Sequence, residues 1–463
     1  MKKNSEQQNI LLMTDSYKVT HWKQLPQDTT HIFSFFESRG GAYGSAVFFG
    51  LQYILKEYLS GPVVTEEKIL YAKKYFREHF GSDEYFNEAG WSHILKEWGG
   101  NLPLEIRAVD EGTVVPNHNV LMTVVNTDPK TAFLTNYMET ILSQVWYPTT
   151  VATQSREMKK TILKYLMETG SPDLIDFKLH DFGFRGSTSI ESAGLGAAAH
   201  LLNFKGTDTL AGIGLAREFY DEAMAGYSIP AAEYSTITSW GKENEAQAYN
   251  NMLDVFPTGP VAIVIDSYDI YNALKEIWGK ELRQKVLMRD GVVILRPDSG
   301  HPPTVVLKVL NILGDIFGYT INHAGYKVLD PHVRIIQGDG IDAAMVETIL
   351  EAMKKDSWSA DNIAFGSGGG LLQKVNRDTL KFAFKCSSVC VSGVWRDVFK
   401  DPVTDPGKRS KAGLLKLVKE KEVYKTTRYE DSYLPTELNL VFENGRMKNE
   451  QTFKEVRSRA QII

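Results

Sequence analysis

Four apolar runs, each ending in polar or glycine-rich residues, constrain the fold of this chain more than any other feature. They occupy residues 261–267, 292–300, 333–340 and 362–374, and helix-patterned segments over 270–286, 303–317 and 341–353 lie between them. Runs that are apolar at successive positions indicate strands buried on both faces, as in a parallel sheet with helical crossovers. We therefore expect an α/β fold with a barrel-like central domain of parallel strands and helices over residues 151–380.

The loops that follow parallel strands gather at one end of the sheet, so their polar residues should converge. In this sequence those residues are Asp266, Arg296, Asp298, Asp339 and Gly368. The glycines after residue 367 let backbone N–H groups approach an anion, and the helix-like start behind them adds partial positive charge. Aspartates, an arginine and a glycine loop suit a magnesium-bound polyphosphate, with Asp266 acting on the metal through its phosphates. Ordinary turns and caps use the same residue types, but four repeats of the pattern favour a site.

The two ends of the chain are expected to build a second, mixed α+β domain from residues 1–150 and 381–463. Alternation and aromatic content favour extended structure over 10–39, strands over 104–126 and a helix over 135–145. Thr65 and Gly81 bracket an amphipathic helix, and Ser155 is expected to cap another that Gly170 closes. The C-terminal part reads as strands over 381–392 and beyond, then a short terminal helix.

Composition excludes several classes of protein. The 463 residues carry 52 basic and 57 acidic side chains, a formal charge of −5, so no overall field attracts nucleic acid or an anionic membrane. Cys386 and Cys390 are too few for a disulfide framework or a zinc site, and we expect them to pack as small apolar residues in a reducing cytoplasm. No apolar stretch reaches membrane-spanning length, which predicts a soluble protein.

Phe182 and Arg185 lie in an aromatic and glycine-rich segment, 177–187, that can hold a flat heterocycle beside an anion. On this segment alone, a core phenylalanine and a surface arginine is the favoured interpretation. Asp208 and the group Glu233, Tyr234 and Ser235 are predicted at the tips of later loops.

Seven motifs together resemble the nicotinamide phosphoribosyltransferases, a group of type II phosphoribosyltransferases. They lie at residues 14–21, 180–186, 203–208, 267–271, 296–300, 337–340 and 365–374, and the likeness runs through nearly the whole chain. The resemblance implies a pentosyltransferase that makes nicotinamide mononucleotide and pyrophosphate from nicotinamide and phosphoribosyl pyrophosphate in NAD salvage. It also implies Mg²⁺, ATP as a co-substrate, and a homodimer with active sites shared between subunits.

Residue roles follow from the resemblance by matching motif. Phe182, and Tyr17 of the other subunit, would sandwich the nicotinamide ring, and Arg185 and Asp208 would bind its carboxamide. Arg296 and Asp298 would hold the ribose and phosphate region. Other expected substrate-binding residues are Ser228, Gly338, Asp339, Gly368 and Gly369, and the basic residues Arg39, Arg377, Lys385, Lys400 and Lys408 around the polyphosphate.

Tyr234 is a departure, because the family has at this position a histidine that takes a phosphoryl group from ATP. A phenol with a pKa of about 10 is mostly protonated at neutral pH, so we expect weak or absent ATP coupling. Glycosyl transfer itself needs no covalent bond to this residue.

Three other functions are compatible with parts of this sequence. A nicotinate phosphoribosyltransferase is disfavoured because an ionised Asp208 would repel the carboxylate of nicotinate. A catalytically impaired ligand-binding or signalling homologue stays open because of Tyr234. A phosphate-handling aldolase is disfavoured because no lysine is expected in a strand interior, where a Schiff base would form.

Overall fold

The four apolar runs form neighbouring strands of one parallel sheet. The computed structural model describes residues 9–404 and 410–462. Its chain divides into two compact units. The barrel unit comprises Gln154–Glu218, Glu222–Val375 and the chain from Gln461, and the terminal unit comprises the chain up to Thr153, Phe219–Asp221 and Asn376–Ala460.

The sheet of the barrel unit has six strands in the order β7-β6-β13-β12-β9-β8, and all its pairings are parallel. This arrangement confirms the predicted parallel sheet. Its strands are β6 (Leu179–Asp181), β7 (Gly206–Thr207), β8 (Val261–Val264), β9 (Val293–Arg296), β12 (Val333–Gln337) and β13 (Ile363–Ser367).

The segment 227–232 links the two edges of this curled sheet. At one end, the N–H of Thr207 donates to the carbonyl of Tyr227 at 3.0 Å, next to β7. At the other end, the N–H of Ala232 donates to the carbonyl of Ala262 at 2.9 Å, on β8. The segment therefore gives the sheet its barrel-like closure and carries its own residues past the carboxyl ends of the strands.

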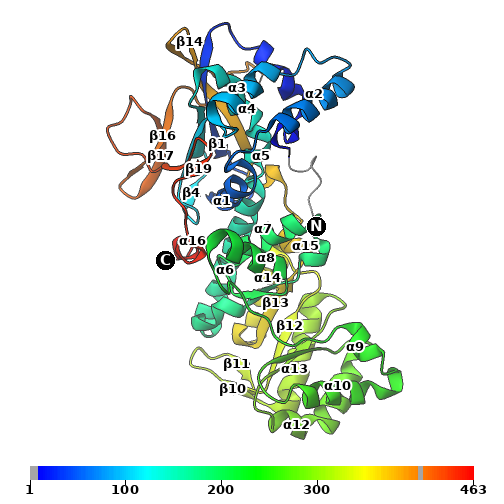
Figure 1. Ribbon diagram of the computed structural model, residues 1–463. Coiled ribbons are helices and arrows are strands. Elements are labelled where there is room, and N and C mark those ends of the chain that lie inside the picture. Colours follow the sequence, from blue (N-terminus) through cyan, green and yellow to red (C-terminus); the bar gives the residue numbers. More distant parts are fainter. Residues whose placement is uncertain (1–8, 405–409, 463) are drawn as a thin grey trace. The chain divides into compact units, whose positions relative to one another are not determined.

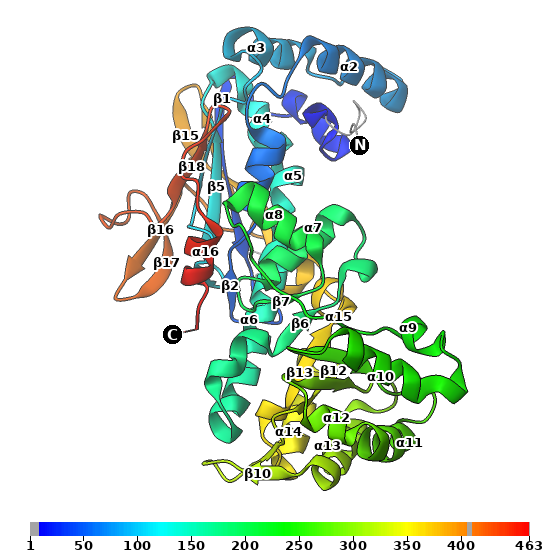
Figure 2. The same cartoon turned by 60° about the horizontal axis from the view of Figure 1, so that its bottom comes forward.

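Helices cover the outside of this sheet (Figure 2). In α13, apolar residues recur at helical spacing and Val306, Val309, Leu310 and Leu313 are buried, so this helix packs against β12 and α14. Gly318, at a φ of 86°, follows the last residue of α13 and ends the helix where the predicted segment 303–317 ends. The main helices of the unit are α6 (Trp146–Thr169), α7 (Ile190–His200), α8 (Leu210–Tyr220), α9 (Tyr234–Thr238), α10 (Glu245–Val255), α13 (Pro302–Phe317), α14 (Ala343–Lys355) and α15 (Gly369–Leu372).

Three local predictions in this unit were wrong in detail. Helix α6 begins at Trp146, with Pro148 in its first turn, so Ser155 does not cap it. Ser155 is instead fully buried, and its hydroxyl lies 3.0 Å from Nδ1 of His200. The predicted helix 270–286 divides into α11 (Ile270–Asn272), the π-helical η9 (Ala273–Glu281) and α12 (Arg283–Leu287). Residues 201–204 form a turn after α7 rather than a strand, because tertiary packing buries this apolar run without a sheet partner.

The terminal unit is built on a seven-stranded antiparallel sheet, in the order β15-β14-β1-β5-β3-β18-β19. Figure 1 labels three of its strands, β1, β14 and β19. Strands from both chain ends alternate in it, and β1 pairs with β14 over almost its whole length. A mixed domain made from both ends of the chain is thereby confirmed. The strands are β1 (Thr29–Ser38), β3 (Leu104–Ala108), β5 (Val120–Asn126), β14 (Phe382–Val391), β15 (Val394–Asp397), β18 (Asn439–Glu443) and β19 (Arg446–Met447).

Shorter elements complete this unit. They are the strand pairs β2 (Ser45–Val47) with β4 (Val114–Pro116) and β16 (Leu415–Glu420) with β17 (Val423–Arg428), and the helices α1 (Leu51–Ile54), η4 (Leu55–Leu59), α2 (Glu66–Phe80), α3 (Glu88–Trp98), α4 (Ala132–Tyr137), α5 (Glu139–Ser143) and α16 (Phe453–Arg459). In α2 the Thr65 hydroxyl accepts from the N–H of Lys68, and Gly81 is left-handed, as the sequence predicts. The predicted helix 135–145 is present as two short helices, α4 and α5.

The first part of the predicted extended segment is helical. Residues Ile10–Leu12 and Ser16–Lys23 form the 3₁₀ helices η2 and η3, and only β1 is extended. The Asn9 side chain accepts from the N–H of Leu11 and starts the first of them, a local cap that outweighs the short alternation of apolar residues. Cys390 is buried and Cys386 partly buried, and both are unbridged. Within residues 9–404 and 410–462, no helix has the length and apolar character needed to cross a membrane.

Candidate active site

A cavity of about 1080 Å³ opens at the carboxyl ends of the barrel strands. Its walls come from the loops after β6, β7, β9, β12 and β13 and from the segment that joins the sheet edges. The sequence-predicted residues among its lining are Phe182, Arg185, Asp208, Tyr234, Arg296, Asp298, Gly338, Gly368 and Gly369. The predicted convergence of the strand-end loops is therefore present in this unit.

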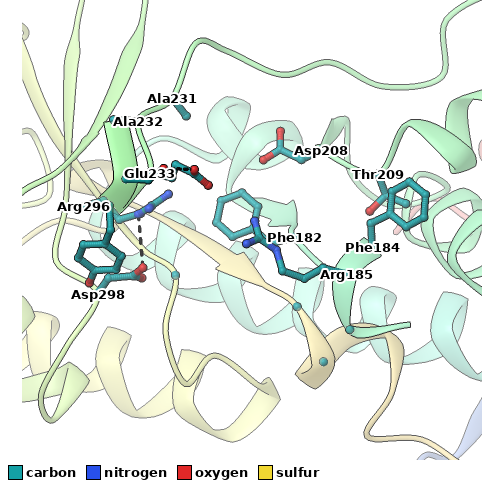
Figure 3. A pocket seen from close by; sticks show the side chains of 16 residues that line it. Phe182, Phe184, Arg185, Asp208, Thr209, Ala231, Ala232, Glu233, Arg296 and Asp298 are labelled. Atoms are coloured by element: carbon teal, nitrogen blue, oxygen red, sulfur yellow. Dashed lines mark hydrogen bonds and ion pairs between the residues drawn. The ribbon is translucent and has the colours of Figure 1, made fainter. Parts of the chain in front are cut away.

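The Phe182 ring lies in the middle of the cavity, with Arg296 and Asp298 on one side and Arg185 and Asp208 on the other (Figure 3). Two glycines make room for it. A Cβ at Gly366, inside β13, would overlap the ring, and a Cβ at Gly338 would lie 3.4 Å from its Cε2. The ring is thus packed closely against backbone on one side and available to stack a flat ligand from the cavity.

The Asp208 carboxylate is held by two donors on the same oxygen. Nε2 of His180 lies 3.0 Å from Oδ1 of Asp208, and the Ser228 hydroxyl donates to that oxygen as well. Burial favours the neutral form of Asp208, but the hydrogen bonds from His180 and Ser228 outweigh it and hold the pKa of Asp208 below its ordinary value. The carboxylate is therefore ionised at neutral pH and is an acceptor only.

A second carboxylate, Asp266, organises the opposite side of the cavity. Its Oδ1 accepts from the Tyr234 hydroxyl at 2.9 Å, and its Oδ2 accepts from the N–H of Asp298 at 2.9 Å and the hydroxyl of Ser299 at 2.5 Å. Burial raises the pKa of Tyr234 well above its ordinary value, and the hydrogen bond to Asp266 and the charges of Asp266 and Asp298 raise it further. The phenol stays protonated at neutral pH.

Arg296 and Asp298 face each other across 3.6 Å, between Nε and Oδ2, and Arg296 Nε has no hydrogen-bond partner among the described residues although it is buried. Burial raises the pKa of Asp298, and the negative charges of Asp266 and Asp339 raise it further against the effect of Arg296. This end of the cavity thus contains a guanidinium with an unfilled hydrogen-bond donor and carboxylates whose ionised form a cation would stabilise.

The glycine loop after β13 lies beside the 182–186 segment, since a Cβ at Gly368 would be 3.4 Å from the carbonyl oxygen of Phe182. Gly368 precedes the short helix α15, and the N–H of Leu371 donates to its carbonyl at 3.0 Å. A Cβ at Gly370 would strike the carbonyl of Ile341, so the backbone here comes close to a neighbouring loop in a way that only glycine permits. Backbone N–H groups of this loop border the cavity.

A metal ion in this cavity would be coordinated largely by the phosphates of a bound substrate. No group of three or more His, Cys, Asp or Glu side chains within residues 9–404 and 410–462 is arranged to bind one. The oxygens of Asp266 already accept three protein donors, whereas the Asp298 carboxylate has, among the residues that the structure describes, its 3.6 Å contact with Arg296 alone. The donor set fits a cation brought in by phosphates near Asp298 and Asp339, and it fits poorly with direct ligation by Asp266.

The remaining predicted residues lie in the terminal unit. Arg39, Arg377 and Lys400 lie close enough to Lys385 for their positive charges to act on it, and we call these four residues the basic cluster. Burial lowers the pKa of Lys385, and the three charges lower it further against the effect of Glu139. Lys408 lies outside the described residues. Tyr17, in η3, is 58% exposed, with His21 edge-on to its ring at 4.9 Å.

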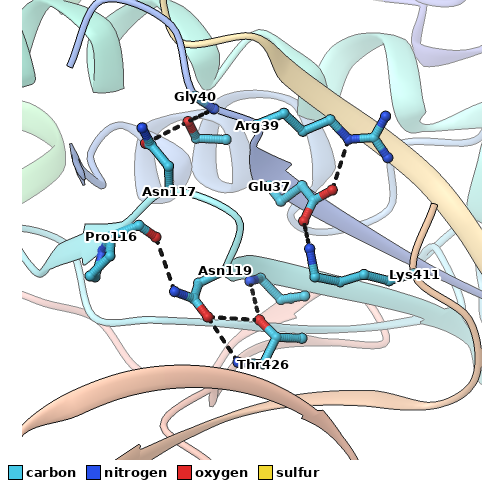
Figure 4. A network of polar contacts seen from close by, with 10 residues as sticks. Glu37, Arg39, Gly40, Pro116, Asn117, Asn119, Lys411 and Thr426 are labelled. Atoms are coloured by element: carbon cyan, nitrogen blue, oxygen red, sulfur yellow. Dashed lines mark hydrogen bonds and ion pairs between the residues drawn. The ribbon is translucent and has the colours of Figure 1, made fainter. Parts of the chain in front are cut away.

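Glu37, near the end of β1, pairs with Arg39 of this cluster and with Lys411 (Figure 4). It is 2% exposed, accepts from Nε of Arg39 at 2.8 Å and forms an ion pair with Lys411. The NH2 nitrogen of Arg39 is buried without a hydrogen-bond partner in the described part of the chain. An anion bound at the cluster would supply that partner.

The sequence did not single out His180, Ser299, Gly366, Glu37 or Lys411. His180, Ser299 and Gly366 all stood within recognised motifs, and Glu37 precedes Arg39 by two residues, the spacing that puts two strand residues on one face. These signals could have marked the residues as candidates. Their individual contacts depend on which loops meet, and no local pattern shows that.

Comparison with known proteins identifies the family of this chain. Residues 177–446 match the nicotinate phosphoribosyltransferase (NAPRTase) family, and residues 9–106 match the N-terminal domain of nicotinamide phosphoribosyltransferase. The nicotinamide phosphoribosyltransferase of Xanthomonas campestris pv. campestris is 51% identical over 98% of each chain, and that of Acinetobacter baylyi is 32% identical over 97% of each chain.

Two solved structures share the fold at low identity. Nicotinate-nucleotide pyrophosphorylase from Pyrococcus furiosus has a TM-score of 0.60 at 14% identity, covering 99% of this chain and 96% of its own. Human nicotinic acid phosphoribosyltransferase has a TM-score of 0.55 at 15% identity, covering 96% of this chain and 92% of its own. From the family matches and the near full-length relatives, the chain belongs to the nicotinate phosphoribosyltransferase family and carries the N-terminal domain described for nicotinamide phosphoribosyltransferase.

Proposed function

We propose that the chain is a nicotinamide phosphoribosyltransferase of NAD salvage. The ring nitrogen of nicotinamide forms a bond to the anomeric carbon of phosphoribosyl pyrophosphate. The bond from that carbon to the pyrophosphate oxygen breaks, and the electron pair leaves with pyrophosphate. The products are nicotinamide mononucleotide and pyrophosphate.

The ionised Asp208 is the observation that carries the choice of base. Its carboxylate accepts hydrogen bonds but cannot donate them, so it can bind the NH₂ of a carboxamide and would repel the carboxylate of nicotinate. Phe182 offers a ring to stack on, and Arg185 lines the same cavity. These three residues would bind the base, with the exposed Ser228 hydroxyl supporting Asp208.

The anionic half of the substrate would lie at the other end of the cavity. Arg296 would bind the phosphate region, Asp298 the ribose hydroxyls, and the loops of Gly338, Asp339, Gly368 and Gly369 the 5′-phosphate. The cluster of Arg39, Arg377, Lys385 and Lys400, with Lys408, would bind polyphosphate. Mg²⁺ carried by the phosphates would neutralise the leaving pyrophosphate, held through Asp298 and Asp339, with Asp266 contributing charge and fixing the Asp298 backbone.

A product assay tests the proposal and its alternatives. The purified chain is incubated with phosphoribosyl pyrophosphate, Mg²⁺ and either nicotinamide or nicotinate, and the nucleotides are separated by chromatography. We expect nicotinamide mononucleotide, with nicotinate a much poorer substrate. Preferential turnover of nicotinate would support a nicotinate phosphoribosyltransferase, and binding of both substrates without any product would support a ligand-binding homologue.

We also propose that ATP stimulates this chain weakly or not at all. Tyr234 occupies the position of the family's phosphoryl-accepting histidine, and its phenol stays protonated while donating to Asp266. Incubation with γ-labelled ATP is expected to leave the protein unlabelled. Stable label on the chain, or a large ATP-dependent gain in product, would contradict this.

A homodimer that shares its sites is the last part of the proposal, in which Tyr17 of a second copy covers the base. Mixing Tyr17→Ala chains with Phe182→Ala chains tests it. If the two residues act across subunits, each mixed dimer contains one intact site and activity returns. If they act within one chain, every site stays defective and mixing restores nothing.

A further inference from the structure

We infer that His180 is a positioning residue that fixes the Asp208 carboxylate for the carboxamide of the base and so sets the preference for amide over carboxylate. This inference rests on the proposed function. His180 lies in β6, on the segment that leads to Phe182, and no substrate contact is required of it.

The first support is the geometry around Asp208. His180 and Ser228 both donate to Oδ1, and no described residue donates to Oδ2. The Asp208 side chain is 48% exposed and lines the cavity, whereas the His180 side chain is 14% exposed and lies behind it. One oxygen is therefore committed to the protein, and the other remains to accept from a ligand.

The second support is the direction of the hydrogen bond. An ionised carboxylate only accepts, so the proton between the two residues belongs to Nε2 of His180. Two donors on one oxygen restrict rotation of the carboxylate and keep its charge in place. Without His180, Asp208 could turn away from the base or take up a proton, and either change would weaken amide recognition.

The third support is that the fold reserves space for this imidazole. A Cβ at Gly206, the neighbour of His180 in β7, would lie 2.6 Å from Nδ1 of His180. The other side of the imidazole packs on Phe182, with ring centroids 5.2 Å apart. His180 therefore connects the group that would bind the carboxamide with the ring that would stack on the pyridine.

Two substitutions at His180 separate positioning from general packing. In His180→Gln the side-chain amide reaches about as far as Nε2 and can still donate to Asp208, whereas the shorter side chain of His180→Asn cannot. We expect His180→Asn to raise the KM for nicotinamide by roughly 10- to 100-fold, the value of a hydrogen bond to a charged group, with a much smaller change in kcat. The KM for phosphoribosyl pyrophosphate should stay near its wild-type value, and His180→Gln should recover most of the loss.

A double-mutant cycle with Asp208→Asn gives the decisive result, because a residue that acts through Asp208 has nothing to position once that charge is gone. In the Asp208→Asn background, we expect His180→Asn to have little further effect on the KM for nicotinamide. In the His180→Asn single variant, we expect the ratio of kcat/KM for nicotinamide over nicotinate to fall by at least about tenfold. Equal losses in His180→Asn and His180→Gln, or fully additive effects with Asp208→Asn, would overturn the inference. If His180→Asn does not fold, His180→Gln and Ser228→Ala decide it: near-normal selectivity in the first and reduced selectivity in the second are required.

Failure of this inference is distinguishable from failure of the proposed function. Absence of nicotinamide mononucleotide with the wild-type chain contradicts the function itself. Normal product from the wild-type chain, together with unchanged KM and selectivity in His180→Asn, contradicts only the role of His180.

Discussion

Gly366 and Phe182 are packed so closely that a side chain on the glycine would occupy the space of the aromatic ring. Glycine in the interior of a strand weakens the strand, and here its absence of a side chain lets the ring lie directly against the backbone of β13. The position of the proposed stacking ring is thus fixed by a residue that would never touch the ligand.

Gly366→Ala should therefore displace Phe182. We expect the KM for nicotinamide to rise at least several-fold and the free energy of unfolding to fall by about 1–3 kcal/mol through overpacking. Steady-state kinetics and urea denaturation measure the two effects. Gly214→Ala is the matched control, because a Cβ there meets nothing within 4 Å on helix α8, and it should be neutral or slightly stabilising. An unchanged KM in Gly366→Ala would mean that Phe182 does not position the base.

Asp208→Asn should reduce discrimination between the two bases. The asparagine amide can accept from a carboxamide or donate to a carboxylate, so kcat/KM for nicotinamide should fall by roughly 10- to 100-fold while nicotinate loses less or gains. Competition between the two bases, followed by quantification of both nucleotides, gives the ratio directly. Asp254→Asn, an exposed carboxylate of α10 that pairs with Lys285, should leave the ratio unchanged.

Arg39 should couple anion binding to stability. One buried nitrogen of Arg39 has no hydrogen-bond partner within residues 9–404 and 410–462, and it would gain an acceptor when an anion binds at the basic cluster. Pyrophosphate should therefore raise the Tm of the wild-type chain, and the rise should be at least halved in Arg39→Gln. Thermal unfolding across a pyrophosphate titration checks this. The exposed Arg446→Gln should behave as wild type. An equal rise in Arg39→Gln would place the anion elsewhere.

Glu37→Gln should destabilise the terminal unit. The substitution removes the counter-charge of Arg39 and Lys411 at a position that is 2% exposed, and breaking a buried ion pair from one side costs about 3–5 kcal/mol. Urea denaturation at two salt concentrations measures the loss. A change below about 1 kcal/mol would show that the pair is screened as surface pairs are.

His200 should make the protein sensitive to mild acid. Complete burial lowers its pKa to about 3, from an ordinary value near 6.5. Between these values the unfolded chain binds a proton that the folded chain does not, so stability is present above the ordinary pKa and falls as the pH decreases from 6.5, by up to about 1.4 kcal/mol per pH unit. Urea midpoints at pH 7, 6 and 5 should fall more steeply for wild type than for His200→Gln. His323→Gln, at an exposed position, should retain the wild-type slope.

Much of the fold was predictable because its signals are local. Helix α2 is capped by Thr65 at its start and by Gly81 at its end. The strands of the parallel sheet are apolar at successive positions, and this pattern indicates burial on both faces. The strand-end residues Arg296, Asp298 and Gly368 could be expected at one cavity because parallel strands present the same ends to the same side.

The sequence by itself determined the alternation of strand and helix and the residue types at the strand ends, since backbone periodicity and capping act over a few neighbouring residues. Tertiary structure decided three further relationships. Ser155, inside helix α6, lies within hydrogen-bond distance of His200, and one oxygen of Asp208 accepts from His180 and Ser228. Gly366 makes space for the ring of Phe182. These relationships join residues far apart in the chain. Their energies depend on which surfaces exclude water together, and no local pattern encodes that.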